Sequence, residues 1–164
     1  MCIRDSAIHP YNKKVYVVNN EGHQVMILNP DLTFYDSFGK YGYGNGQFSF
    51  PWDVAFDNNG NVYIADSANK RIQVLTAEGQ FLRMFGMENL TWPTSISIDC
   101  DNVVYVTDDN DHCVSVFTCE GKFLTSFGTE GSGPGQFNEL RGITVDKNGV
   151  VYVSDSGNSR LQLC

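Results

Sequence analysis

One tripeptide pattern occurs four times along the chain, and this repetition constrains the fold more than any other feature. The residues Val15-Tyr16-Val17 recur at positions 104–106 and 151–153 and, with Ile64 in place of the second Val, at positions 62–64. The four tyrosines are 47, 42 and 47 residues apart. A Phe-Gly pair at 38–39, 85–86 and 127–128 keeps the same spacing. The sequence therefore predicts an array of equivalent structural units.

Each unit contains four segments with the pattern of short β-strands. In the second unit the first segment, residues 54–56, is apolar, and an Asp-Asn-Asn-Gly-Asn turn follows it. Such a turn supplies the side-chain caps and the positive φ that a tight hairpin needs. The second segment carries the Tyr, the third is residues 71–75, and a Glu-Gly turn leads into the fourth, residues 81–85. No segment has a helical period of 3.6 residues, so the units are predicted to be blades of an all-β propeller.

The repeat also sets the expected domain limits. The blades are predicted at residues 7–50, 51–92, 93–139 and 140–164, and the last has only three of its four strands. Residues 1–6 do not match the repeat, and we interpret them as a leader outside the propeller. An open arc of four antiparallel blades leaves apolar blade faces exposed. We therefore expect a fragment of a longer ring, with missing blades or self-association covering those faces.

The residues from 46 to 74 resemble the NHL repeat, in the order Gly-Gln-Phe, Pro, Val, Asp, Gly, Val-Tyr, Asp, Asn, Arg-Ile-Gln-Val. That family is named for an Asn-His-Leu triplet, which here reads Asn69-Lys70-Arg71, Asp111-His112-Cys113 and Asn158-Ser159-Arg160. The resemblance covers residues 7–164. Over this range the chain is similar to the propellers of tripartite-motif NHL proteins. It implies a ring of six blades, of which this chain supplies about four.

Composition narrows the classes of partner and compartment. The formal net charge is -8, which disfavours nucleic acid because an acidic surface repels phosphate. No apolar stretch approaches the roughly 18 residues of a membrane span, and no secretory signal is present in this piece. Five cysteines without a Cys-x-x-Cys pair favour neither a disulfide framework nor a zinc site. We expect a cytoplasmic protein with no cofactor and no metal.

The variable loops are predicted to carry the binding groups. Loops between blades and loops joining the second and third strands lie on one face of a propeller blade, and here they differ from repeat to repeat. Trp52, Thr94 and Arg141 occupy equivalent positions, expected just before each innermost strand near the channel mouth. The predicted binding residues on this face are Lys40, Tyr43, Trp52, Lys70, Thr94, His112 and Arg141. The alternative is that Trp52 covers a blade junction and Arg141 is a solvated charge.

Residues that recur in every blade are assigned to the scaffold. An Asp ends the second strand at positions 66, 108 and 155, and an Arg follows five residues later in two of the three cases. We expect this Asp to cap its turn and to pair with the Arg. The histidines at 23 and 112 are equivalent by register and match the His of the family triplet. The Gly-rich runs ending at Phe48 and Phe137 lack the Lys-Ser/Thr of a phosphate loop and are read as interblade crossings.

Three functions remain open at this point. The first is a non-catalytic scaffold that binds protein or peptide partners, in the manner of the substrate-binding part of a ubiquitin-ligase-like protein. The second is RNA binding, for which Lys40, Trp52, Lys70 and Arg141 would be needed. The third is a metal-dependent lyase or hydrolase, but only three histidines are present and no recurring set of metal ligands accompanies them. No catalytic residue is assigned.

Overall fold

The computed structural model describes residues 3–164, which form four antiparallel sheets in chain order. The first sheet is β1 (Ile3–Ile8), β2 (Val15–Asn19), β3 (Gln24–Leu28) and β4 (Phe34–Phe38). The second is β5 (Pro51–Phe56), β6 (Val62–Asp66), β7 (Arg71–Leu75) and β8 (Phe81–Phe85). The third is β9 (Pro93–Ile98), β10 (Val104–Asp108), β11 (Cys113–Phe117) and β12 (Phe123–Phe127). The fourth is β15 (Leu140–Val145), β16 (Val151–Asp155) and β17 (Arg160–Leu163).

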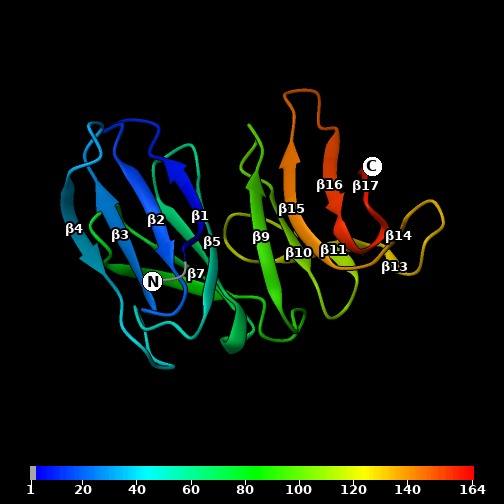
Figure 1. The fold of residues 1–164 in the computed structure, drawn as a ribbon, viewed down its shortest axis with the longest axis horizontal. Helices are drawn as coiled ribbons and strands as arrows, with labels where there is room; N and C mark the ends of the chain where they lie inside the picture. The colour runs from blue at the N-terminus through cyan, green and yellow to red at the C-terminus, as the bar shows by residue number, and fades with distance from the viewer. Residues whose placement is uncertain (1–2) are drawn as a thin grey trace.

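These sheets are the blades of a β-propeller, as the repeat predicted (Figure 1). The first strands of successive blades pack side by side, β1 on β5, β5 on β9 and β9 on β15, so they are the innermost strands. Two single 3-10 turns, η1 (Ser67–Asn69) and η2 (Ser156–Asn158), follow β6 and β16. A short parallel pair, β13 (Thr129–Glu130) with β14 (Gln136–Phe137), closes the loop before the fourth blade. No helix within residues 3–164 is long and apolar enough to cross a membrane.

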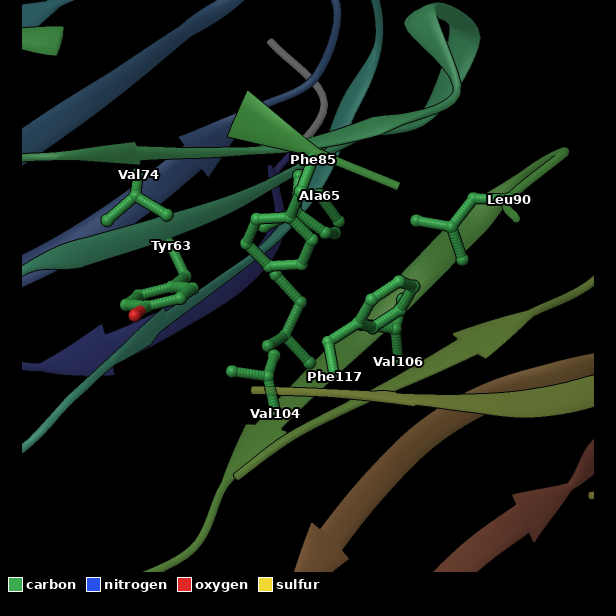
Figure 2. Close-up of a cluster of buried hydrophobic side chains, with 10 residues drawn as sticks. Tyr63, Ala65, Val74, Phe85, Leu90, Val104, Val106 and Phe117 are labelled. Atoms are coloured by element: carbon green, nitrogen blue, oxygen red, sulfur yellow. The ribbon is translucent and has the colours of Figure 1, made fainter. Parts of the chain in front are cut away.

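The hydrophobic core lies between blades rather than inside one of them. Side chains alternate along each strand, so Tyr63 and Ala65 of β6 face the third blade while Val62 and Ile64 face the first. Figure 2 shows the interface of the second and third blades, where Phe85 and Phe117 meet at 5.1 Å between ring centroids. A third cluster joins the third and fourth blades around Phe137 and Leu140. Each blade is therefore stabilised by its neighbours.

The innermost strand of the first blade begins earlier than the sequence indicated. Strand β1 starts at Ile3, which pairs with Asn19, and Ser6 pairs with Val17. Residues 3–6 therefore belong to the first blade, and the interpretation of residues 1–6 as a leader outside the fold was wrong for these four. The register shifts between Ile3 and Ser6, as it does near the start of the other innermost strands. This irregularity interrupts the apolar alternation and hides the strand. Residues 1 and 2 lie outside the described residues.

A buried arginine holds the long loop between the first two blades, residues 39–50. The Nε of Arg71 donates to Asp66 at 2.8 Å, and its two terminal nitrogens donate to the carbonyls of Tyr43, Gly44 and Gln47. Gln73 adds a bond from its Nε2 to the Gln47 carbonyl at 2.6 Å and accepts from the Gly46 N–H. Arg71 is only 4% exposed. We call Asp66, Arg71 and Gln73 the loop clamp.

The fourth blade repeats the loop clamp and the third blade lacks it. Arg160 pairs with Asp155 at 2.7 Å and donates to the carbonyls of Ser132, Gly133 and Gln136. In the third blade, Cys113 replaces the Arg, and the preceding loop is five residues shorter. Asp108 there accepts from the N–H groups of Thr91 and Trp92, and Asp66 and Asp155 accept equivalent bonds from the N–H groups of Ser49 and Asn138 in addition to their Arg. The Asp–Arg pairing predicted from sequence is confirmed, and the missing Arg matches the missing loop carbonyls.

The root of each long loop is fixed by a glycine and a phenylalanine. Gly39 and Gly128 have φ values of 95° and 101°, which favour glycine over other residues. A Cβ on either one would lie 2.5 Å from the ring of Phe48 or Phe137. Both rings are fully buried and fill the gap between blades. The loop therefore leaves and re-enters the scaffold at defined points.

A buried carboxyl group links the innermost strands of the second and third blades. One oxygen of Asp53 accepts from the Ser95 hydroxyl and from the Ile96 N–H, both at 2.7 Å, and the other accepts from the Val54 N–H. Burial raises the pKa of the Asp53 carboxyl to about 7, and the negative charge of Asp5 contributes to the rise. The equivalent residues in the next two blades are Ser95 and Gly142, so the repeat gave no signal for it.

Replacing Arg71 by Met is expected to lower the free energy of unfolding by about 3–5 kcal/mol, because it leaves the buried Asp66 carboxylate without its partner. The matched change Arg160→Met should have a smaller effect, since the Arg160 side chain is 29% exposed and water already screens this ion pair. Urea denaturation of both variants measures the difference. Equal losses for the two variants would contradict the importance of burial at the loop clamp.

The Asp53→Asn variant is expected to change how stability depends on pH. The folded chain holds the Asp53 proton up to about pH 7, whereas an unfolded Asp releases it near pH 3.9. The contribution of Asp53 to the free energy of unfolding is therefore largest below about pH 4. Up to about 4 kcal/mol of this contribution is lost as the pH rises through 7. Urea denaturation at several pH values should show a flatter decline for the variant. Parallel curves for the two proteins would show that Asp53 titrates normally.

Candidate functional site

The variable loops meet at one end of the blades, as the topology predicted. The N–H of Phe50, before the second blade, donates to Nδ1 of His23 in the β2–β3 loop at 3.1 Å. Asn20 of the same loop donates to the Pro51 carbonyl at 2.8 Å. One blade further on, the N–H of Asp109 donates to the Trp92 carbonyl. Interblade loops and β2–β3 loops therefore build a common surface, which we call the mouth face.

A cavity of about 350 Å³ opens on the mouth face where the first three blades meet. This volume is at the small end of the range for ligand pockets. Three of the lining residues are aromatic and three are polar or charged, and they come from the first two blades and the loops that follow each of them. The lining residues are Arg4, Asn20, Glu21, Phe50, Trp52 and Trp92. The cavity therefore joins two indoles and a phenyl ring to groups that can hydrogen-bond.

Trp52 lies at the centre of this arrangement. The guanidinium of Arg4 is 4.4 Å from the Trp52 ring centroid, and the guanidinium of Arg141 is 5.3 Å from it. Both distances are within the range of cation–π attraction. Arg141 comes from the fourth blade and also lies 3.9 Å from Asp109 and 3.7 Å from Glu139. Trp52 is thus connected to charged residues of the first, third and fourth blades.

Aromatic side chains extend from the cavity over the loop before the second blade. The His23 ring lies 4.8 Å from Phe50 and 4.9 Å from Tyr41 between centroids. The hydroxyls of Tyr41 and Tyr43 are 3.1 Å apart. Tyr41, Tyr43 and Phe50 are all exposed, Tyr43 by 70%. We call His23, Tyr41, Tyr43, Phe50, Trp52 and Trp92 the aromatic band.

Phe50 is held in an unfavourable backbone conformation at the surface. Its φ is 50°, in the left-handed region, and its side chain is 43% exposed. A bulky non-glycine residue is rare there, and such outliers concentrate at functional sites. The conformation belongs to the loop, because the equivalent Glu139 has a φ of 54°. The aromatic side chain at this position is therefore not required by the fold.

The structure treats the three equivalent positions differently. Trp52 and Arg141 reach the mouth face, although each is the second residue of its innermost strand rather than a loop residue before it. Thr94 does not reach it. Its side chain is 2% exposed, with its hydroxyl 3.0 Å from that of Thr107 and donating to the Leu140 carbonyl. Thr94 links the third blade to the fourth, so the expectation that its side chain is displayed at the channel mouth was wrong.

The remaining predicted residues lie around the edge of the mouth face. Lys40 and Lys70 are exposed, and Lys70 ends the 3-10 turn η1 with a φ of 56°. His112 is half-buried, and its Nδ1 has no hydrogen-bond partner, unlike the equivalent atom of His23. Tyr43 belongs to the aromatic band. Sequence reasoning omitted Arg4, Asn20 and Phe50 from the predicted site, and the signal for Phe50 was an apolar residue where the equivalent loop has Glu139.

The histidines and acidic residues do not gather into a reactive centre. His9 is buried and lies 3.1 Å from the Gly60 carbonyl through its Nε2, on the face opposite the mouth. Across residues 3–164, no three His, Cys, Asp or Glu side chains are placed to share a metal ion. The repeated Asp66 and Asp155 are committed to the loop clamps.

Comparison with known families and proteins agrees with the repeat. The family model "NHL repeat" matches residues 48–75, and the family model "6-bladed beta-propeller" matches residues 88–162. Protein lin-41 of Caenorhabditis elegans is 39% identical over 46 residues, which are 28% of this chain and 4% of that protein. The E3 ubiquitin-protein ligase TRIM71 of Rattus norvegicus is 44% identical over 45 residues, 27% of this chain and 5% of the ligase. NHL repeat-containing protein 3 of Homo sapiens is 33% identical over 72 residues, 42% of this chain and 21% of that protein.

Solved structures share the fold at low sequence identity. A catalytically inactive virginiamycin B lyase from Staphylococcus aureus, solved with quinupristin, aligns with a TM-score of 0.76 and 16% identity over 97% of this chain. The WD40 β-propeller domain of Doa1 aligns with a TM-score of 0.73 and 13% identity over 98% of this chain. The chain spans about half of each of these structures. The repeat, the family-model matches and the blade architecture together show that this chain contains an NHL repeat and has the fold of a β-propeller.

Proposed function

We propose that the chain is a non-catalytic recognition scaffold that binds a segment of a protein partner on its mouth face. The observation that carries this proposal is the aromatic band, of which Tyr41, Tyr43 and Phe50 lie on the loop that the loop clamp holds from below. Exposed Tyr, Trp and Phe side chains are enriched where proteins bind one another. Exposed apolar patches often mark interaction sites on proteins, and the exposed rings of Tyr41, Tyr43 and Phe50 support such a site here.

The cavity beside Trp52 gives this surface an anchor point. Interface energy is concentrated where a side chain of one partner fills a well-packed pocket of the other. Trp92 and Phe50 supply the apolar walls, and the carboxamide of Asn20 lies in the same lining. A peptide side chain placed there would lose water on contact with two indoles. The pocket therefore supports peptide recognition with one dominant anchor residue.

Similarity to the curated relatives supports a place in a larger protein. The named relatives include an E3 ubiquitin-protein ligase, and the chain spans about a fifth or less of each relative. By analogy, we propose that the mouth face selects a substrate for a ubiquitin-ligase-like protein. RNA binding is the second candidate, favoured only by the exposed Lys40 and Lys70 beside the aromatic band.

Replacing Trp52 by Ala is expected to weaken peptide binding strongly. The immobilised chain is used to select from a phage-displayed library of random twelve-residue peptides, and the enriched peptides are retested on variants. Loss of a central aromatic anchor should weaken binding by about 30-fold, equivalent to about 2 kcal/mol. The control Phe34→Ala removes an exposed ring from outer strand β4 and should leave binding intact. Failure to enrich any peptide, or equal loss in both variants, would refute the proposed function.

The Phe50→Asn variant is expected to separate binding from stability. Asn tolerates the left-handed conformation that Phe50 adopts, so the free energy of unfolding should change by less than about 1 kcal/mol. Binding of the selected peptides should fall by about tenfold, because a wall of the cavity is removed. Thermal unfolding and fluorescence polarisation measure the two effects. A variant that unfolds more easily and binds normally would show that Phe50 serves the fold alone.

A further inference from the structure

We infer that the partner segment is basic, with a large apolar or aromatic anchor flanked by Lys or Arg residues. This inference rests on the proposed function and names the chemistry of its ligand. It comes from the charges that border the aromatic band on the side of the third and fourth blades.

Two loops of the mouth face share one backbone and carry different side chains. Tyr41 pairs with Phe48 in a parallel bridge, and Glu130 pairs with Phe137 in the same way. By this register, the loop before the second blade has Tyr41 and Phe50 where the loop before the fourth blade has Glu130 and Glu139. Each loop is fixed by its own copy of the loop clamp, with Arg71 in one and Arg160 in the other. One side of the mouth is therefore aromatic, and the equivalent structure on the other side is acidic.

Carboxylates outnumber cations on the acidic side. The loops before the third and fourth blades contain three exposed Glu residues. The β10–β11 loop contains two Asp residues. We call these residues the acidic rim, and they are Glu88, Asp109, Asp111, Glu130 and Glu139. Arg141 is the cation among them and is already near Asp109 and Glu139. The acidic rim therefore keeps an excess of negative charge that a cationic ligand can neutralise.

The acidic rim begins directly beside the cavity. Arg141 lies 5.3 Å from the Trp52 centroid and within 4 Å of Asp109 and Glu139, so one guanidinium separates the indole from both carboxylates. A side chain inserted next to Trp52 therefore has neighbours in sequence that pass over the acidic rim. Lys and Arg at those positions meet opposite charge, whereas Asp, Glu or a phosphate would meet like charge. Electrostatics thus favours a basic peptide over an acidic peptide or RNA.

Four fluorescein-labelled nine-residue peptides test this ligand chemistry by fluorescence polarisation. The first has Trp between Lys/Arg flanks, the second has Trp between Asp/Glu flanks, the third has Trp between Gly/Ser flanks, and the fourth has Ser between Lys/Arg flanks. The first should bind at least about tenfold more tightly than each of the others. Labelled nine-residue oligouridylate serves as the RNA probe and should bind more weakly than the first peptide.

Paired variants assign the preference to the acidic rim. The double change Asp109→Asn with Glu139→Gln should weaken the basic Trp peptide by about three- to tenfold, and it should reduce the salt dependence of binding. The matched pair Asp101→Asn with Glu78→Gln removes the same charge from turns on the opposite face and should leave binding unchanged. Circular dichroism of both double variants confirms that each remains folded.

The outcomes separate this inference from the proposed function. Equal binding of the acidic and basic Trp peptides, with loss in Trp52→Ala, would overturn the inference and keep the recognition scaffold. Tighter binding of oligouridylate than of every peptide would overturn both and favour RNA. No binding of any Trp peptide, together with failure of the library selection, would refute the scaffold itself. Equal weakening in the two double variants would show that only the overall charge matters, and it would overturn the role of the acidic rim.

Discussion

The architecture of the mouth face depends on the buried ion pair between Arg71 and Asp66. Paired charges are tolerated in a dry interior only when nearly all of their hydrogen-bonding capacity is used. Arg71 meets this demand by donating to loop carbonyls as well as to Asp66, so the loop supplies the partners that the guanidinium requires. Loop and clamp therefore exist together or not at all. The third blade demonstrates this dependence, because Cys113 and a short loop occur in the same repeat.

Repetition divides the molecule into a scaffold and a display surface. The parts of the loop that face inward, such as Phe48 and Gln47, recur in the fourth blade as Phe137 and Gln136 with the same contacts. The parts that face outward do not recur, and they change from aromatic at Phe50 to acidic elsewhere. Since the clamp fixes the backbone from beneath, the outward side chains can vary without affecting the fold. The mouth face can therefore acquire sectors of different chemistry.

The sequence predicts the features that every blade shares. It does not predict the roles of residues whose equivalents have different surroundings in other blades. The period, the turn residues and the Asp–Arg spacing were sufficient for the blades and the loop clamps. Thr94 was misjudged because equivalence along the chain does not reveal that its hydroxyl lies within bonding distance of Thr107 and bonds to the Leu140 carbonyl of the next blade. Arg4 was missed because the irregular register of β1 breaks the strand pattern. Asp53 was missed because only a three-dimensional contact with Ser95 explains it.

The strained backbone at Phe50 fits the energetics of such a display. A left-handed conformation costs a non-glycine residue about 1–2 kcal/mol, whereas a buried ion pair with its bonds resists disruption by about 3–5 kcal/mol. The clamp can therefore impose the strain locally without loss of the loop. An aromatic side chain that is already ordered loses little conformational entropy when a partner binds. Contacts beside Trp52 can then contribute to affinity with little loss of conformational entropy in the loop. A flexible loop of the same sequence would lose that entropy when the partner binds.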